Sequence, residues 1–127
     1  MRELIRHLDP AAEHYLQEGC YINELSNGAE DPAVSIARTR VPPGVTTRWH
    51  RLRGVAERYV VLAGKGRVQV GSLPTQQVAA GAVVLIPPGC AQRITNSGHE
   101  DLVFLAVCSP RFLPECYEDC EADFGPD

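Results

Sequence analysis

The residues best suited to chemistry in this chain are a histidine and a glutamate seven positions apart, His50 and Glu57. His50 precedes a turn, and Glu57 opens the apolar run ERYVVLAG, which has the composition of a β-strand. Imidazole and carboxylate groups bind divalent first-row metals, and they also transfer protons as general acids and bases. The pair therefore predicts either a metal site or a polar cluster that handles protons.

The segments around this pair indicate an all-β chain. Alternating or β-branched runs are separated by breaks that contain glycine and proline. The predicted strands lie within residues 20–27, 33–41, 57–64, 64–75, 76–89, 91–98 and 100–110, with two strands in the fifth segment. Turn signals about every 8–12 residues are typical of a sandwich or barrel, and no helix long enough to build a core is expected.

Two frames of glycine and proline resemble the paired motifs of the cupin superfamily. The first frame contains Gly44, His50, Glu57 and Gly64. The second frame contains Gly81, Pro87, Pro88, Gly89, Gln92 and Asn96. The resemblance covers about residues 34–110. It implies a double-stranded β-helix, which is an antiparallel jelly-roll barrel of two packed sheets.

The same resemblance implies a reduced set of metal ligands. The first cupin motif usually has two histidines with one residue between them, followed by the glutamate, and the second motif supplies a third histidine. Leu52 and Gln92 take the places of the second and third histidines here. The implied ligands are His50, Glu57 and Gln92, which would hold a divalent ion (Zn, Mn, Fe or Ni) with modest affinity. The alternative is a hydrogen-bonded cluster without an ion.

Two functions follow from a polar barrel interior. One is a metal-dependent enzyme, isomerase-like or dioxygenase-like, with Glu57 and His50 as the catalytic residues. The alternative is a non-catalytic cupin that binds or senses a sugar or a carboxylic acid without metal. The candidate ligand-binding residues are Arg38, Arg40, Tyr59 and Gln92. Arginine suits carboxylates and phosphates because its planar fork binds them in a bidentate manner, and a purely structural role explains inward polar residues least well.

The totals indicate one domain without nucleic-acid or membrane partners. The chain has 127 residues and a formal net charge of −4, which gives no attraction to phosphate backbones. No apolar run approaches about 18 residues, and the first ten residues lack the apolar centre of a signal peptide, so we expect a cytoplasmic protein. We expect one cupin domain over residues 1–127, with the barrel at about residues 15–110 and the N-terminal arm and acidic C-terminal tail packed outside it.

The cysteines and the tail carry weaker signals. Five cysteines form no framework of disulfide spacing, which favours reduced thiols. The tail after Pro110 is acidic and interrupted by proline, so we expect it to be irregular. Cys116 and Cys120 in this tail are interpreted as a pair of exposed thiols, with metal binding or oxidation to a disulfide as the alternatives.

The partners that we expect are a small-molecule ligand and a second copy of the chain. A small barrel whose strands are flanked by apolar residues such as Trp49, Val68 and Val70 leaves open sheet edges, which a second copy would cover in a homodimer. The cupin resemblance also implies pairing of this kind.

Overall fold

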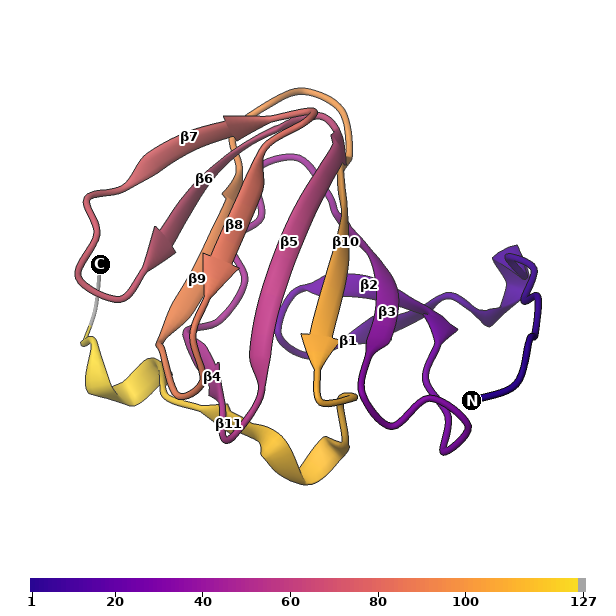
Figure 1. Ribbon diagram of the computed structural model, residues 1–127. Helices are drawn as coiled ribbons and strands as arrows, with labels where there is room; N and C mark the ends of the chain where they lie inside the picture. The colour runs from indigo at the N-terminus through magenta and orange to yellow at the C-terminus, as the bar shows by residue number, and fades with distance from the viewer. Residues whose placement is uncertain (126–127) are drawn as a thin grey trace.

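Two antiparallel β-sheets form a barrel in the computed structural model, which describes residues 1–125 (Figure 1). The first sheet consists of β1 (His14–Leu16), β2 (Cys20–Ser26), β3 (Ser35–Val41), β10 (Leu102–Ser109), β5 (Ala56–Ala63) and β8 (Val83–Ile86), in that order. The second consists of β11 (Tyr117–Asp119), β4 (His50–Leu52), β9 (Gln92–Asn96), β6 (Lys65–Val70) and β7 (Gln76–Ala79). The all-β, antiparallel prediction is confirmed.

Helical structure is limited to short 3₁₀ turns within the described residues. These are η1 (Pro10–Ala12), η2 (Pro114–Cys116) and η3 (Glu121–Asp123). Over residues 1–125, no helix has the length and apolar character needed to cross a membrane.

The barrel is filled at one end and polar at the other because the inward residues change character along β5 and β10. On β5 the inward positions are Glu57, Tyr59 and Val61, and the neighbouring strand β10 pairs Cys108 with Glu57 and Phe104 with Val61. The apolar end packs as one buried cluster that includes Val61, Phe104 and Ile94. Burial of this cluster drives folding. The end of the barrel that contains Glu57 is not filled by this cluster.

The described part of the acidic tail, residues 111–125, contains a strand, which corrects the prediction that the tail is irregular. Its strand β11 pairs antiparallel with β4, so that Tyr117 lies opposite Leu52 and Asp119 lies opposite His50. Cys116 and Cys120 are 8% and 3% exposed, so the expectation of exposed thiols is wrong. The segment is too short and too acidic to show the alternation of polar and apolar residues that is typical of a strand. It is a strand because it pairs with β4.

The apolar residues on which the dimer prediction rested lie inside the chain. Trp49, Val68 and Val70 are all buried, and the ring of Trp49 stacks on Phe124 of the tail with centroids 4.0 Å apart. They cannot cover the surface of a second copy. The homodimer itself stays a prediction.

The turn that joins β5 to β6 requires glycine for two reasons. Gly64 has a φ of +86°, and a Cβ atom there would lie 2.6 Å from the backbone oxygen of Asp101. Gly81 has a similar φ of +93°, but a Cβ atom there would meet nothing within 4 Å. A side chain at Gly81 would therefore cause backbone strain alone, whereas a side chain at Gly64 would cause both strain and a steric collision.

We expect Gly81→Ala to lower the free energy of unfolding by about 1–2 kcal/mol, which is the cost of left-handed backbone for an L-residue. Gly64→Ala should cost about 3 kcal/mol or more, at the upper end of single substitutions, because the collision with the Asp101 backbone adds to that strain. Urea denaturation of both variants measures the difference. Equal losses would show that the backbone at Asp101 moves aside freely.

Candidate functional site

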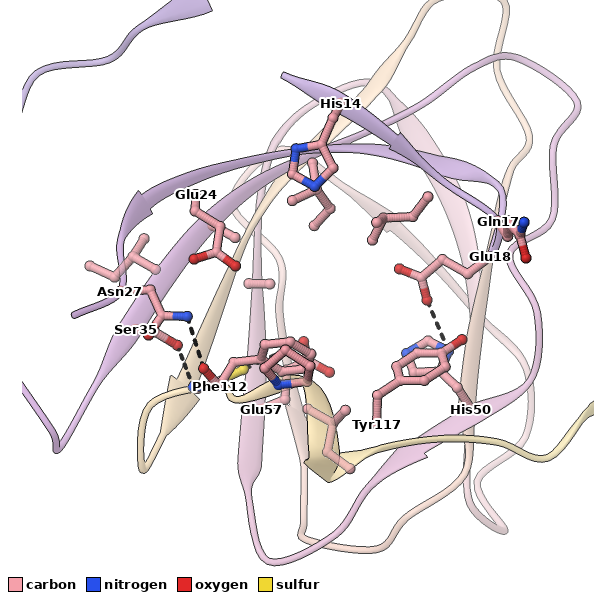
Figure 2. Close-up of a pocket in the computed structure, with 18 of the residues that line it drawn as sticks. His14, Gln17, Glu18, Glu24, Asn27, Ser35, His50, Glu57, Phe112 and Tyr117 are labelled. Atoms are coloured by element: carbon pink, nitrogen blue, oxygen red, sulfur yellow. Dashed lines mark hydrogen bonds and ion pairs between the residues drawn. The ribbon is translucent and has the colours of Figure 1, made fainter. Parts of the chain in front are cut away.

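A cavity of about 620 Å³ occupies the polar end of the barrel (Figure 2). Its wall is formed by β1 to β5, β10 and the tail, and it includes His50, Glu57 and Leu52 of the sequence prediction. Apolar side chains make up part of this wall, among them Ile22 and Phe112. A cavity of this size is suited to a small organic molecule, since ligand pockets measure about 300–1,000 Å³.

Glu57 is a buried carboxylate at the boundary between the cavity and the filled end. Its side-chain oxygen Oε1 accepts a hydrogen bond of 2.7 Å from Gln92 Nε2, and Oε2 accepts a weak one of 3.8 Å from Cys108 Sγ. Burial raises the pKa of Glu57, while the charge of His50 and the Gln92 hydrogen bond act in the opposite direction. Glu57 therefore holds its proton to a higher pH than an exposed glutamate.

Gln92 supports Glu57 from behind rather than facing the cavity. Its exposed fraction is 0%, and it is not among the residues of the cavity wall. The Tyr59 hydroxyl donates a 2.5 Å hydrogen bond to the amide oxygen of Gln92. Both ends of the amide are thus engaged, and the predicted ligand-binding residues Tyr59 and Gln92 form a relay that fixes the Glu57 carboxylate.

His50 has a defined tautomer because of its local backbone. Its Nδ1 atom lies 2.8 Å from the carbonyl oxygen of Arg48, and a carbonyl only accepts, so Nδ1 carries the proton. The ring stacks on Tyr117 of the tail, with centroids 5.2 Å apart and an interplanar angle of 18°. In neutral His50, Nε2 is therefore the nitrogen with a free lone pair.

Glu18, in the turn between β1 and β2, is a site residue that the sequence analysis missed. Its Oε1 accepts from Cys20 Sγ at 3.1 Å, and its Oε2 lies 3.5 Å from His50 Nδ1. Among the described residues, none donates a hydrogen bond to the buried Oε2 atom. Glu18 and Tyr117 both lie outside the two glycine frames, and no periodic pattern marks either of them.

Arg38 and Arg40 are not brought to the cavity. Both belong to the outer face of β3, where Arg40 Nη2 contacts Glu13 Oε1 at 2.7 Å and Arg38 Nη1 contacts Glu13 Oε2 at 3.6 Å. Arg40 also reaches Asp101 at 3.3 Å. The adjacent Arg40 lowers the pKa of Glu13, so this group stays ionised and ties the segment before β1 to the sheet. Neither arginine is part of the cavity wall.

The donor set does not fit a metal ion. Within residues 1–125, no three side chains of His, Cys, Asp or Glu are placed to share one ion. Of the three implied ligands, Gln92 presents its oxygen to Tyr59 and its nitrogen to Glu57. Leu52 lies on the same face of β4 as His50 and is buried there, so it fills the place of the missing histidine with carbon.

Comparison with known proteins identifies the family. A family model described as the cupin domain matches residues 37–108, which is more than half of the chain. This chain is a cupin.

Several other proteins resemble it. The glucose-6-phosphate isomerase of Thermococcus onnurineus is 28% identical over 84% of this chain and 69% of that protein. The oxalate-binding protein of Thermotoga maritima is 35% identical over 56% of this chain, which spans 58% of its length. A double-stranded β-helix protein from Klebsiella pneumoniae has a TM-score of 0.72 at 16% identity, covering 87% of this chain and 92% of its own. This last likeness confirms the predicted double-stranded β-helix.

We expect the double variant Leu52→His/Gln92→His to bind about one equivalent of a divalent metal, because it restores the histidines of the cupin pattern beside His50 and Glu57. Wild-type protein prepared beside it should hold far less than one equivalent. Elemental analysis after incubation with Ni²⁺ and gel filtration measures both. The same double variant with His50→Ala serves as the control and should lose the metal. Stoichiometric metal in the wild type would contradict the geometry described above.

Glu57→Gln should make the protein more stable at neutral pH, because the raised pKa of Glu57 means that its ionisation is less favourable in the folded state. The cost to the wild type is absent below the ordinary glutamate pKa of 4.5, grows as pH rises toward the folded pKa, and stays constant above it. The amide introduced by the substitution can still accept a hydrogen bond from Gln92. Denaturant unfolding of both proteins from pH 4 to pH 8 tests this, and a gain that grew toward pH 4 would contradict it.

Proposed function

We propose that this cupin binds a small organic molecule in the barrel cavity through Glu57, His50 and Glu18, without a tightly held metal ion. The observation that carries the proposal is the buried carboxylate of Glu57 and the partly buried one of Glu18, which face one cavity beside a histidine. Glu57 ionises unfavourably there, and Glu18 Oε2 has no hydrogen-bond donor among the described residues. Buried polar groups without partners are costly, so a ligand that supplies donors would offset that cost on binding.

The groups around the carboxylates support a binding site, because hydrogen bonds hold the site residues in defined orientations. Tyr59 and Gln92 hold Glu57 in one orientation, and the Arg48 carbonyl fixes the tautomer of His50. Such fixed groups bind ligands well because little freedom is lost when the complex forms. The relatives point the same way, since one of them is named an oxalate-binding protein.

Proton transfer is a second candidate function, favoured by the raised pKa of Glu57. A carboxyl that keeps its proton can act as a general acid, and the free Nε2 of neutral His50 can act as a general base. Both residues belong to the wall of the same cavity. The reaction class would be an isomerisation that moves a proton, which needs no metal. The dioxygenase alternative has less support, because its chemistry asks for more metal donors than this cavity offers.

A thermal-shift screen of small metabolites tests the binding proposal. Compounds that stabilise the wild type should bind Glu57→Gln and His50→Ala about tenfold to a hundredfold more weakly, since a hydrogen bond to a charged group contributes about 1.5–3 kcal/mol. Glu100→Gln is the matched control, because Glu100 is exposed and is not part of the cavity wall. Titration calorimetry on each hit gives the affinities. Hits that bind all four proteins equally would place the binding site elsewhere.

A further inference from the structure

The ionisable side chains of the cavity wall are mainly acidic. Four carboxylates take part in the wall, and they are Glu18, Glu24, Glu57 and Asp119. The wall contains a single arginine, Arg48, and no lysine. The remaining ionisable bases of the wall are two histidines, His14 and His50.

The single arginine is already neutralised. Arg48 Nε lies 2.5 Å from Asp119 Oδ2, and its Nη2 lies 3.4 Å from Asp119 Oδ1. This pairing lowers the pKa of Asp119, which keeps both partners charged. Three carboxylates remain, and no arginine or lysine among residues 1–125 forms an ion pair with Glu18, Glu24 or Glu57.

These three carboxylates surround one opening. Figure 2 shows Glu18 and Glu24 on different sides of the cavity, each directed toward its interior, with His14 between them, and Glu57 and His50 belong to the same wall. They come from the β1–β2 turn, from β2 and from β5, so three separate elements converge on the same space. The buried Oε2 of Glu18 has no hydrogen-bond donor among the described residues, which marks a place that a ligand group would fill.

The cavity therefore has the wrong charge for an anion. Oxalate and glucose 6-phosphate, which appear in the names of the relatives, are anions. The two arginines expected to bind such groups, Arg38 and Arg40, pair with Glu13 away from the cavity. An anion that entered would meet three carboxylates without a free arginine to offset them.

Resting on the proposed binding function, we infer that the ligand of this cavity carries an amine or another organic cationic group, held between Glu18 and Glu57. An ammonium group supplies several N–H donors and a positive charge, whereas Glu18 Oε2 accepts no hydrogen bond among the described residues and Glu57 accepts only from the uncharged groups of Gln92 and Cys108. The carbon skeleton of the ligand would contact apolar wall residues such as Leu16, Ile22 and Ala106. Glu24 lies exposed at the cavity wall and adds attraction at longer range.

Two sets of size-matched probes test this charge preference by titration calorimetry at pH 7.5 and constant ionic strength. The first set is butylammonium, 1-butanol and butyrate, and the second is choline with its uncharged analogue 3,3-dimethyl-1-butanol. Each cation should bind the wild type at least tenfold more tightly than its neutral partner, and butyrate more weakly than butanol. Oxalate, glucose 6-phosphate and Ca²⁺ are added as separate probes.

Matched variants assign the preference to the cavity. Glu18→Gln and Glu24→Gln should each reduce the advantage of the cation, whereas Glu100→Gln, with the same change in net charge, should keep it. Glu24 is exposed, so its variant remains informative if Glu18→Gln does not fold. A cation advantage that is equal in all three variants would overturn the inference, because general surface charge would then explain it.

The remaining outcomes separate this inference from the proposed function. Neutral or anionic probes that bind as tightly as the cations would overturn the charge preference and leave binding in the cavity intact. Ca²⁺ that binds more tightly than any ammonium compound would overturn the organic ligand and point to a metal. No binding of any probe to the wild type at tens of millimolar would count against both the inference and the proposed function.

Discussion

The burial of the Glu57 carboxylate is the constraint on which the arrangement of this barrel depends. A carboxylate in an apolar interior costs free energy unless neighbouring groups form hydrogen bonds or ion pairs with it. Gln92 meets this need from the second sheet, and Tyr59 fixes Gln92 in turn, so that two sheets are joined through one polar relay. Val61 and Phe104 fill the barrel beyond this relay, and the cavity lies on its other side. The hydrogen-bonded groups of Glu57, Gln92 and Tyr59 thus separate the cavity from the apolar core.

The tail has a corresponding role at the part of the cavity wall formed by His50. Tyr117 stacks on His50, and the pairing of β11 with β4 places this ring against the imidazole. Ion pairs hold the strand in place, with Arg51 and Arg53 on Glu118, and with Arg48 on Asp119 at the cavity wall. Exposed pairs contribute little free energy singly, but here several of them act on one short strand.

The sequence predicted the barrel well because its signals are local. Alternation along β5 and β10 shows which residues face inward, and the two glycine frames place His50, Glu57 and Gln92 on inward faces of their strands. That Gln92 binds Glu57 and Tyr59 rather than a metal ion could not be predicted. Its partner Tyr59 comes from the other sheet, and only the fold brings the two together. Arg38 and Arg40 were misjudged for a similar reason. Their partner Glu13 lies in a segment without a clear pattern, so nothing in the sequence showed that they were already paired.

The cavity wall has a further consequence that arises from where its residues lie along the chain. The cupin family match ends at residues 37 and 108, yet much of the wall comes from outside it. Glu18 and Glu24 precede the match, and Phe112, Tyr117 and Asp119 follow it. His50 and Glu57 lie inside the match, so ligand choice is encoded partly within the stretch that defines the family and partly outside it. Cupins with closely similar barrels can thus diverge in ligand through their two ends, which makes exchange of these ends between relatives a direct route to changed specificity.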